Sequence, residues 1–181
     1  MKVATPGRLL DPELHWQPAQ RVAVPADIGN WLTDSSSLTR RLQRFGHFSV
    51  TPLSQRVVRP QPAEALMLRQ PPQHRALIRE VLLYLDDSAV VFARSILPLT
   101  SLKGANRVLG HMARRSLGAE LFRAPAAERR AIWLARIPPH RLPLAVTETC
   151  WGRQSLFYKR GQPLLVAEVF LPGFSAITGI D

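Results

Sequence analysis

The sequence predicts an α+β fold built on one antiparallel β-sheet with helices packed over it. Two pairs of apolar segments, residues 75–85 with 89–97 and residues 150–158 with 164–171, are each joined by a short polar connection. This arrangement is typical of antiparallel hairpins. Segments with strand-like alternation also outnumber segments with helical periodicity, which favours a sheet with helices on it over a helical bundle.

The first part of the chain carries weaker signals. Residues 1–25 are rich in proline and weakly periodic, and we expect an extended arm lying on the domain. Residues 27–32 fit a short turn or helix. The serines at 35–37 offer N-caps for a helix with an apolar stripe over residues 38–45, which ends at Gly46.

The remaining elements are predicted from local patterns. Residues 48–51 alternate like a strand, and Pro52 indicates its end or a sheet edge. The proline-rich residues 60–72 predict a loop. Apolar positions recur at helical spacing over residues 104–122, with a break at a Ser-Leu-Gly step, and residues 130–137 predict another strand.

Length and composition suit one domain over residues 1–181, with residues 174–181 as a tail; 46% of the 181 residues are apolar. No apolar run approaches the roughly 18 residues of a membrane span, and residues 1–20 lack the apolar region of a signal peptide. The only cysteine, Cys150, allows no internal disulfide. We therefore expect a cytoplasmic monomer without stable membrane insertion.

The net charge is +11, from 24 basic and 13 acidic residues. Such an excess favours either an anionic partner or merely a genome rich in arginine codons. The arginines are scattered, with no run longer than a pair and no interleaved aromatic residues of the kind that bind single strands. We therefore expect no nucleic-acid partner, and a small anionic ligand stays open.

Three charged residues interrupt strand faces that are otherwise apolar. Period-two alternation places Arg79, Arg94 and Glu168 each among apolar neighbours of its own predicted strand. Such a face is solvent-exposed, pairs its charges with each other, or lines a cavity for a charged ligand, because an unpaired buried charge is costly. A structural Arg–Glu pair and a functional cavity both stay open.

The sequence gives little support to a metal site, a phosphate-binding loop or a catalytic nucleophile. The five histidines show no metal-ligand spacing with each other or with Cys150, and there is no glycine-rich phosphate loop. Residues 152–155 lack the flanking pattern of a nucleophile elbow. Cys150, beside Trp151 in an apolar strand, predicts a core thiol. We expect neither a metal nor a cofactor.

Six short segments follow, in order, a pattern of one enzyme family. They are W-L-T-D-S-S-S-L-T-R-R at 31–41, L-I-R-E-V-L-L at 77–83, F-A-R-S-I-L-P at 92–98, S-L-G-A-E-L-F at 116–122, W-G-R-Q-S at 151–155 and P-L-L-V-A-E-V-F-L-P at 163–172. In these segments the chain resembles the chorismate pyruvate-lyases, over about residues 25–173. It departs from the family at Leu38, where methionine is also seen, and at Gln154, where the family has a second arginine. The arm and residues 175–181 are unmatched.

The resemblance implies about six strands with helices on one side, and a closed cavity beneath helical flaps. It implies conversion of chorismate to 4-hydroxybenzoate and pyruvate, the first committed step of ubiquinone biosynthesis, without a cofactor. Arg79 would hold the product carboxylate, and Glu168 would lie near the oxygen-bearing end of the ring. The backbone N–H groups of Leu38 and Leu117 would contact the ligand.

Several alternatives stay open. Arg94 and Arg153 are candidates for the second carboxylate of chorismate or its ether oxygen. Glu168 suits a general acid, a general base or a hydrogen-bond partner, and direct transfer within the substrate is a further route. The competing function is a small-molecule-sensing domain of the kind found in transcription regulators. We expect the roughly 25 leading residues to be too few for an attached DNA-binding domain.

Overall fold

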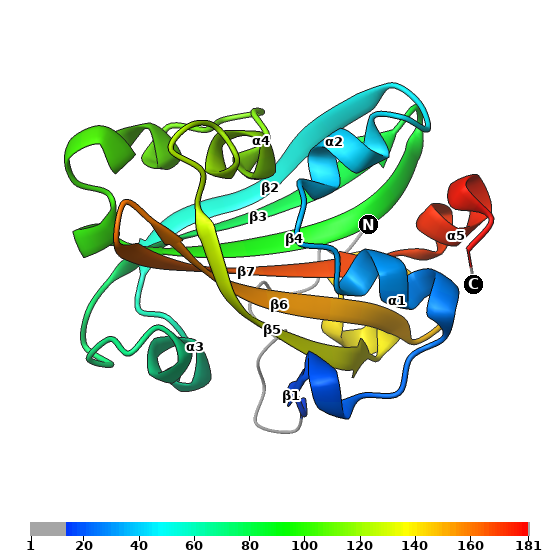
Figure 1. Ribbon diagram of the computed structural model, residues 1–181, viewed down its shortest axis with the longest axis horizontal. Helices are drawn as coiled ribbons and strands as arrows, with labels where there is room; N and C mark the ends of the chain where they lie inside the picture. The colour runs from blue at the N-terminus through cyan, green and yellow to red at the C-terminus, as the bar shows by residue number, and fades with distance from the viewer. Residues whose placement is uncertain (1–13, 181) are drawn as a thin grey trace.

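A single antiparallel sheet runs through the computed structural model, which describes residues 14–180. The strands are β1 (Gln17–Pro18), β2 (Phe48–Val58), β3 (Ala76–Leu85), β4 (Ser88–Pro98), β5 (Glu128–Ile137), β6 (Cys150–Lys159) and β7 (Gln162–Phe170). Their order is β1-β5-β6-β7-β4-β3-β2 (Figure 1). The predicted α+β class, the single sheet and both hairpins are confirmed, with seven strands rather than about six.

The extra strand comes from the predicted arm. Gln17 and Pro18 pair with Trp133 and Leu134 of β5, so this part of the arm extends the sheet. Residues 1–13 of the arm lie outside the described residues. Proline suits this position because an edge strand leaves one side of its backbone unpaired.

The opposite edge also differs from its prediction. β2 continues past Pro52 to Val58, with a register irregularity between Pro52 and Ser54. Pro52 therefore marks a sheet edge and a bulge, and the prediction that the strand ends there was wrong. A bulge leaves one residue of a strand unpaired, so proline, which has no N–H to donate, is tolerated there and the strand continues beyond it.

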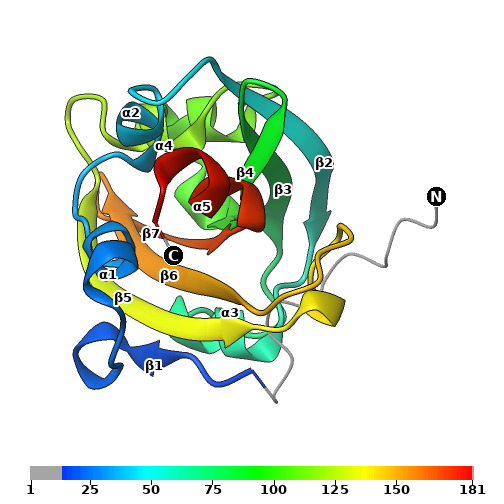
Figure 2. The ribbon, with the colours of Figure 1, turned by 90° about the vertical axis from the view of Figure 1, so that its right-hand side faces the viewer.

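The sheet curls into a trough, with α2 and α4 over its open side (Figure 2). The helices are α1 (Ala26–Leu32), α2 (Leu38–Leu42), α3 (Pro62–Met67), α4 (Leu117–Leu121) and α5 (Pro172–Thr178). The Ser37 side chain caps α2 as predicted, accepting a hydrogen bond from the backbone N–H of Arg40. α5 occupies most of the expected tail, and its Phe174 is fully buried.

Both faces of the sheet carry apolar layers. One face packs Val81, Leu83 and Phe170 against Trp31 of α1 and Leu38 of α2. The other face packs Ile78, Ile96 and Leu165 against Leu68, which directly follows α3. The expectation of helices on one side only is therefore wrong for α3, which forms where a loop was predicted. No helix among residues 14–180 is long and apolar enough to cross a membrane.

Candidate active site

The pairing register decides which charged residues share a face of the sheet. Glu168 on β7 pairs with Ala93 on β4, and Ala93 pairs with Val81 on β3. Arg79 lies two residues from Val81 along β3, so Arg79 and Glu168 project from the same face. This is the face covered by α2 and α4.

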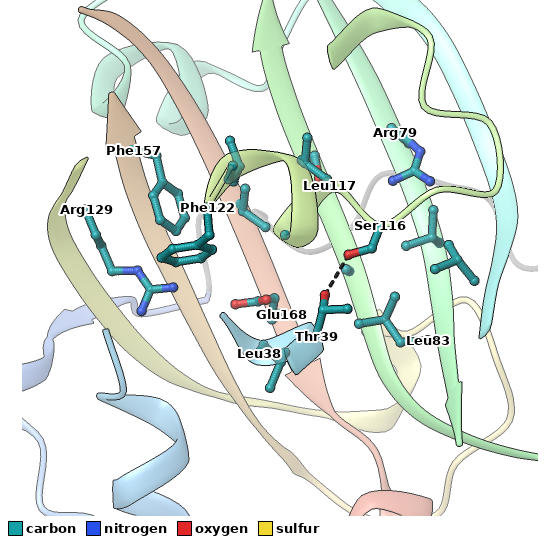
Figure 3. A pocket seen from close by; sticks show the side chains of 17 residues that line it. Leu38, Thr39, Arg79, Leu83, Ser116, Leu117, Phe122, Arg129, Phe157 and Glu168 are labelled. Atoms are coloured by element: carbon teal, nitrogen blue, oxygen red, sulfur yellow. Dashed lines mark hydrogen bonds between the residues drawn. The ribbon is translucent and has the colours of Figure 1, made fainter. Parts of the chain in front are cut away.

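A pocket lies between this face and the two helices (Figure 3). The empty space between these elements, open mouth included, is about 510 Å³. Apolar side chains form most of the wall. The polar and charged lining residues are Thr39, Arg79, Ser95, Ser116, Arg129 and Glu168.

Arg79 is a buried cation without an acidic partner in the described part of the chain. Its side chain is 2% exposed, and its Nη2 donates to the backbone oxygens of Ala113 and Arg115 at 2.8 and 3.0 Å. Its Nε is buried without a partner, and no carboxylate among residues 14–180 forms an ion pair with it. Burial lowers the pKa of Arg79, because the charged form loses hydration. A ligand carboxylate would supply the missing counter-charge.

Glu168 has a protein partner, and that partner is Arg153 rather than Arg79. Its Oε2 accepts a hydrogen bond from Arg153 Nε at 2.6 Å. The same guanidinium donates through Nη1 to the backbone oxygens of Trp31 and Asp34, at 2.7 and 3.3 Å. Arg153 thus ties the segment before α2 to β6. No described residue donates a hydrogen bond to the other carboxylate oxygen of Glu168, which leaves Oε1 available to a ligand.

Arg94 does not reach the pocket. It pairs in register with Glu80 of β3 and Ala167 of β7, so its side chain projects from the opposite face of the sheet. There its Nε donates to Glu64 Oε1 at 2.8 Å and its Nη1 to Glu80 Oε1 at 2.6 Å. The interpretation of Arg94 as a candidate for the second carboxylate is therefore corrected: its donors are used by two buried glutamates.

The two helices over the pocket contact each other through their first turns. Thr39 Oγ1 and Ser116 Oγ share a hydrogen bond of 2.6 Å, and Ser116 also caps α4 by accepting from Ala119 N at 3.2 Å. Leu38 and Leu117 are the first residues of α2 and α4 and line the pocket. The first N–H groups of a helix have no partner within the helix.

Lys159 anchors the far end of α4. It is 1% exposed, and its ammonium group lies among backbone carbonyl oxygens at and just after the C-terminal end of α4. It donates at 2.8–3.1 Å to the backbone oxygens of Glu120, Leu121, Arg123 and Pro125. α4 is therefore held at one end by β6 and at the other by α2.

Sequence reasoning missed Arg129, which lines the pocket from the start of β5. The predicted strand began one residue later, at residue 130. The register also shifts between Arg129 and Ala131, so simple alternation from the middle of the strand gives the wrong face for Arg129. A cluster of three or more metal-ligating side chains is not found in the described part of the chain.

The family model and the similar sequences of known proteins agree on one family. The model of the chorismate lyase family matches residues 10–177. A probable chorismate pyruvate-lyase of Alcanivorax borkumensis is 52% identical, covering 90% of this chain and 78% of that protein. A probable chorismate pyruvate-lyase of Aromatoleum aromaticum is 43% identical, covering 84% and 88%. The effector domain of PhnF from Mycobacterium smegmatis shares the fold, with a TM-score of 0.56 at 15% identity, covering 76% and 89%.

Proposed function

The chain belongs to the chorismate lyase family, and from this premise we propose that it converts chorismate to 4-hydroxybenzoate and pyruvate in the pocket under α2 and α4. One observation carries the proposal most directly: Arg79 is a buried guanidinium that lines the pocket and lacks an acidic partner among the described residues. A planar guanidinium matches a carboxylate with two parallel hydrogen bonds. Both substrate and aromatic product carry a ring carboxylate for it.

The proposed pose follows the length of the pocket. The ring carboxylate lies on Arg79, and the oxygen at the opposite ring position faces Glu168 (Figure 3). The backbone N–H groups of Leu38 and Leu117 donate to the ligand from above. Apolar side chains from β3 and β7, including Val81 and Val166, hold the ring between these polar ends.

The reaction breaks the ether bond at ring carbon three and removes the hydrogen at carbon four. The enolpyruvyl group gains a proton and leaves as pyruvate, so the atoms of chorismate are divided between the two products. Aromatisation of the ring drives the elimination, and we propose that it needs no metal or cofactor. The protein grips the substrate and excludes water. Glu168 acts as general acid, general base or hydrogen-bond partner, with direct transfer within the substrate as the remaining route.

We place the reaction at the first committed step of ubiquinone biosynthesis. We also propose that residues 1–181 act as one domain, as a monomer in the cytoplasm and without a nucleic-acid partner. A sensing role in the same fold is the alternative. The family match favours the enzyme, because the likeness to PhnF concerns the fold alone.

The first prediction is catalysis without added metal. Purified protein treated with a chelator is expected to convert chorismate to equimolar 4-hydroxybenzoate and pyruvate, because the elimination has its own driving force. Both products are measured by chromatography, with heat-denatured protein as the control. Absence of turnover, dependence on added metal, or formation of a different chorismate product would contradict the proposal. Binding of 4-hydroxybenzoate without turnover would instead favour the sensing alternative.

The second prediction concerns closure of the two helices. A Cβ atom added at Gly118 would lie 2.9 Å from Thr39 Oγ1, which is closer than such atoms approach. Gly118→Ala is therefore expected to push α4 from α2 and break the hydrogen bond between Thr39 and Ser116. Losing one such bond, worth about 1 kcal/mol, should raise the dissociation rate of 4-hydroxybenzoate by roughly fivefold.

Stopped-flow displacement of bound 4-hydroxybenzoate measures that rate. Gly110→Ala is the matched control, because its added Cβ meets only Leu102 and Leu77 side-chain atoms at 3.7 and 4.0 Å. Equal dissociation rates in Gly118→Ala and Gly110→Ala would show that contact between α2 and α4 does not retain the ligand.

A further inference from the structure

Arg129 faces the pocket from the side opposite Arg79. Figure 3 shows the two guanidinium groups at opposite ends of the pocket, with Glu168 on the Arg129 side. Two contacts hold the Arg129 side chain in place. Its Nη1 donates to the backbone oxygen of Asp34, and its Cζ lies 4.7 Å from the centroid of the Phe157 ring. Its Nε is buried and has no hydrogen-bond partner among the residues that the structure describes.

The Arg129 end of the pocket holds more positive charge than negative. Arg129 and Arg153 both interact electrostatically with Glu168, but Arg153 alone takes the carboxylate at hydrogen-bond distance. The carboxylate of Asp34 is occupied by Ser36 and Arg41, and only its backbone oxygen meets Arg129. Two guanidinium groups therefore share one carboxylate. Arg153 Nη2 is also buried, and no described residue accepts a hydrogen bond from it.

The pKa of Arg129 reflects this excess of positive charge. Burial, followed by repulsion from Arg153, lowers the pKa of Arg129 to about 10, although Glu168 and Asp34 act in the opposite direction. The guanidinium is therefore charged at neutral pH, in surroundings that penalise its charge. An anion entering the pocket would relieve that penalty, as another would at Arg79.

Chorismate carries two carboxylates, one on ring carbon one and one on the enolpyruvyl group at carbon three. In the proposed pose Arg79 takes the first and Glu168 faces carbon four. Carbon three is the neighbour of carbon four, so its substituent extends toward the end where Glu168 and Arg129 lie. We propose that Arg129 binds the enolpyruvyl carboxylate of chorismate.

This inference rests on the proposed function and makes Arg129 a specificity-determining residue. 4-Hydroxybenzoate lacks the enolpyruvyl carboxylate, so it meets Arg79 but makes no ion pair with Arg129. The two arginines therefore differ in which ligands they bind. Arg79 serves substrate and product alike, and Arg129 serves the substrate alone. Arg94 is excluded from this role by its position on the other face, and Arg153 is already committed to Glu168.

The test compares Arg129→Met with Arg130→Met. Arg130 is the neighbouring residue, is well exposed, pairs with Glu128 and does not line the pocket. Arg129→Met is expected to weaken chorismate binding on the order of 10- to 100-fold, with 4-hydroxybenzoate affinity unchanged within about threefold. Arg129→Lys should recover part of the loss because it restores the charge without the planar fork. Arg130→Met should bind both ligands like the wild type.

Equilibrium binding of 4-hydroxybenzoate is measured by calorimetry. Because the enzyme consumes chorismate, its affinity for chorismate is compared through KM, determined with kcat from product formation. Unchanged chorismate affinity in Arg129→Met would overturn the inference, and so would an equal loss for both ligands. If Arg129→Met does not fold, the milder Arg129→Lys must show the same selective loss. A wild type that binds chorismate without turnover would overturn the proposed lyase activity, while the binding comparison would still decide the role of Arg129.

Discussion

Replacing Arg94 with methionine is expected to lower the free energy of unfolding by about 3–5 kcal/mol. Arg94 is 4% exposed and is the cation between Glu64 and Glu80, which are 0% and 4% exposed. Methionine fills much of the same space but leaves two buried carboxylates without a counter-charge. Glu64 also accepts from Gln61 N at 2.8 Å, so the loss should loosen α3 on the sheet as well.

Urea unfolding of Arg94→Met measures this effect, and a compensated variant separates charge from packing. In E64Q/E80Q/R94M no buried charge is stranded, and we expect it to regain most of the lost free energy. The folded fraction of Arg94→Met should bind 4-hydroxybenzoate like the wild type, because Arg94 lies on the face away from the pocket. Wild-type stability with lost ligand affinity would show instead that Arg94 belongs to the site.

Arg94 was predicted as a candidate for the pocket but lies on the other face of the sheet, and the cause is the register of the β3–β4 hairpin. If the β3–β4 hairpin is extended evenly from its turn, where Leu85 pairs with Ser88, Arg79 stands opposite Arg94. The register shifts by one residue between Leu83 and Tyr84, so Arg94 stands opposite Glu80. A one-residue shift moves every later side chain to the other face. The alternation along β3 and over residues 92–96 of β4 was predicted correctly, but the bulge at the start of β4 left no signal in the sequence pattern.

Arg129 escaped prediction for a related reason, and α3 for a different one. The shift between Arg129 and Ala131 breaks the alternation at the start of β5, where the pattern of a strand is weakest. α3 had a usable signal, since Pro62 stands at its start and Gln61 and Glu64 form a reciprocal capping pair. The surrounding prolines outweighed that signal. Glu64 could be recognised as a partner of Arg94 only from the tertiary structure.

The strands themselves could be predicted because their signal is local. Period-two alternation and polar turns identify both hairpins without knowledge of the rest of the chain. The pocket depends instead on non-local pairing: β7 lies between β4 and β6, which places Glu168 beside Arg153 and on the same face as Arg79. The open choice between a structural pair and a cavity is resolved differently for the two residues. Glu168 has an arginine partner, whereas Arg79 faces the pocket and has no acidic partner between residues 14 and 180.

Replacing Arg79 with methionine is expected to weaken binding of both chorismate and 4-hydroxybenzoate by about 3 kcal/mol, or on the order of 100-fold. The variant loses the planar group that we propose meets the ring carboxylate common to both ligands. Stability of the free protein should change by less than about 1.5 kcal/mol. The substitution loses two hydrogen bonds to exposed residues 113 and 115, but it also removes a buried charge that no carboxylate of the described residues neutralises.

Calorimetric titration with 4-hydroxybenzoate, the KM for chorismate, and thermal melts with and without 4-hydroxybenzoate test this prediction together. Arg75→Met is the matched control, since Arg75 directly precedes the same strand but is exposed and donates to Val57 O away from the pocket. Arg79→Met should lose the ligand-induced rise in melting temperature that Arg75→Met keeps. A large loss of stability with ligand affinity intact would identify Arg79 as a structural cation held by the carbonyls of residues 113 and 115. Loss of a structural cation lowers stability and leaves ligand affinity intact, whereas loss of a ligand-binding cation lowers affinity and leaves stability nearly unchanged, so one pair of variants decides between them.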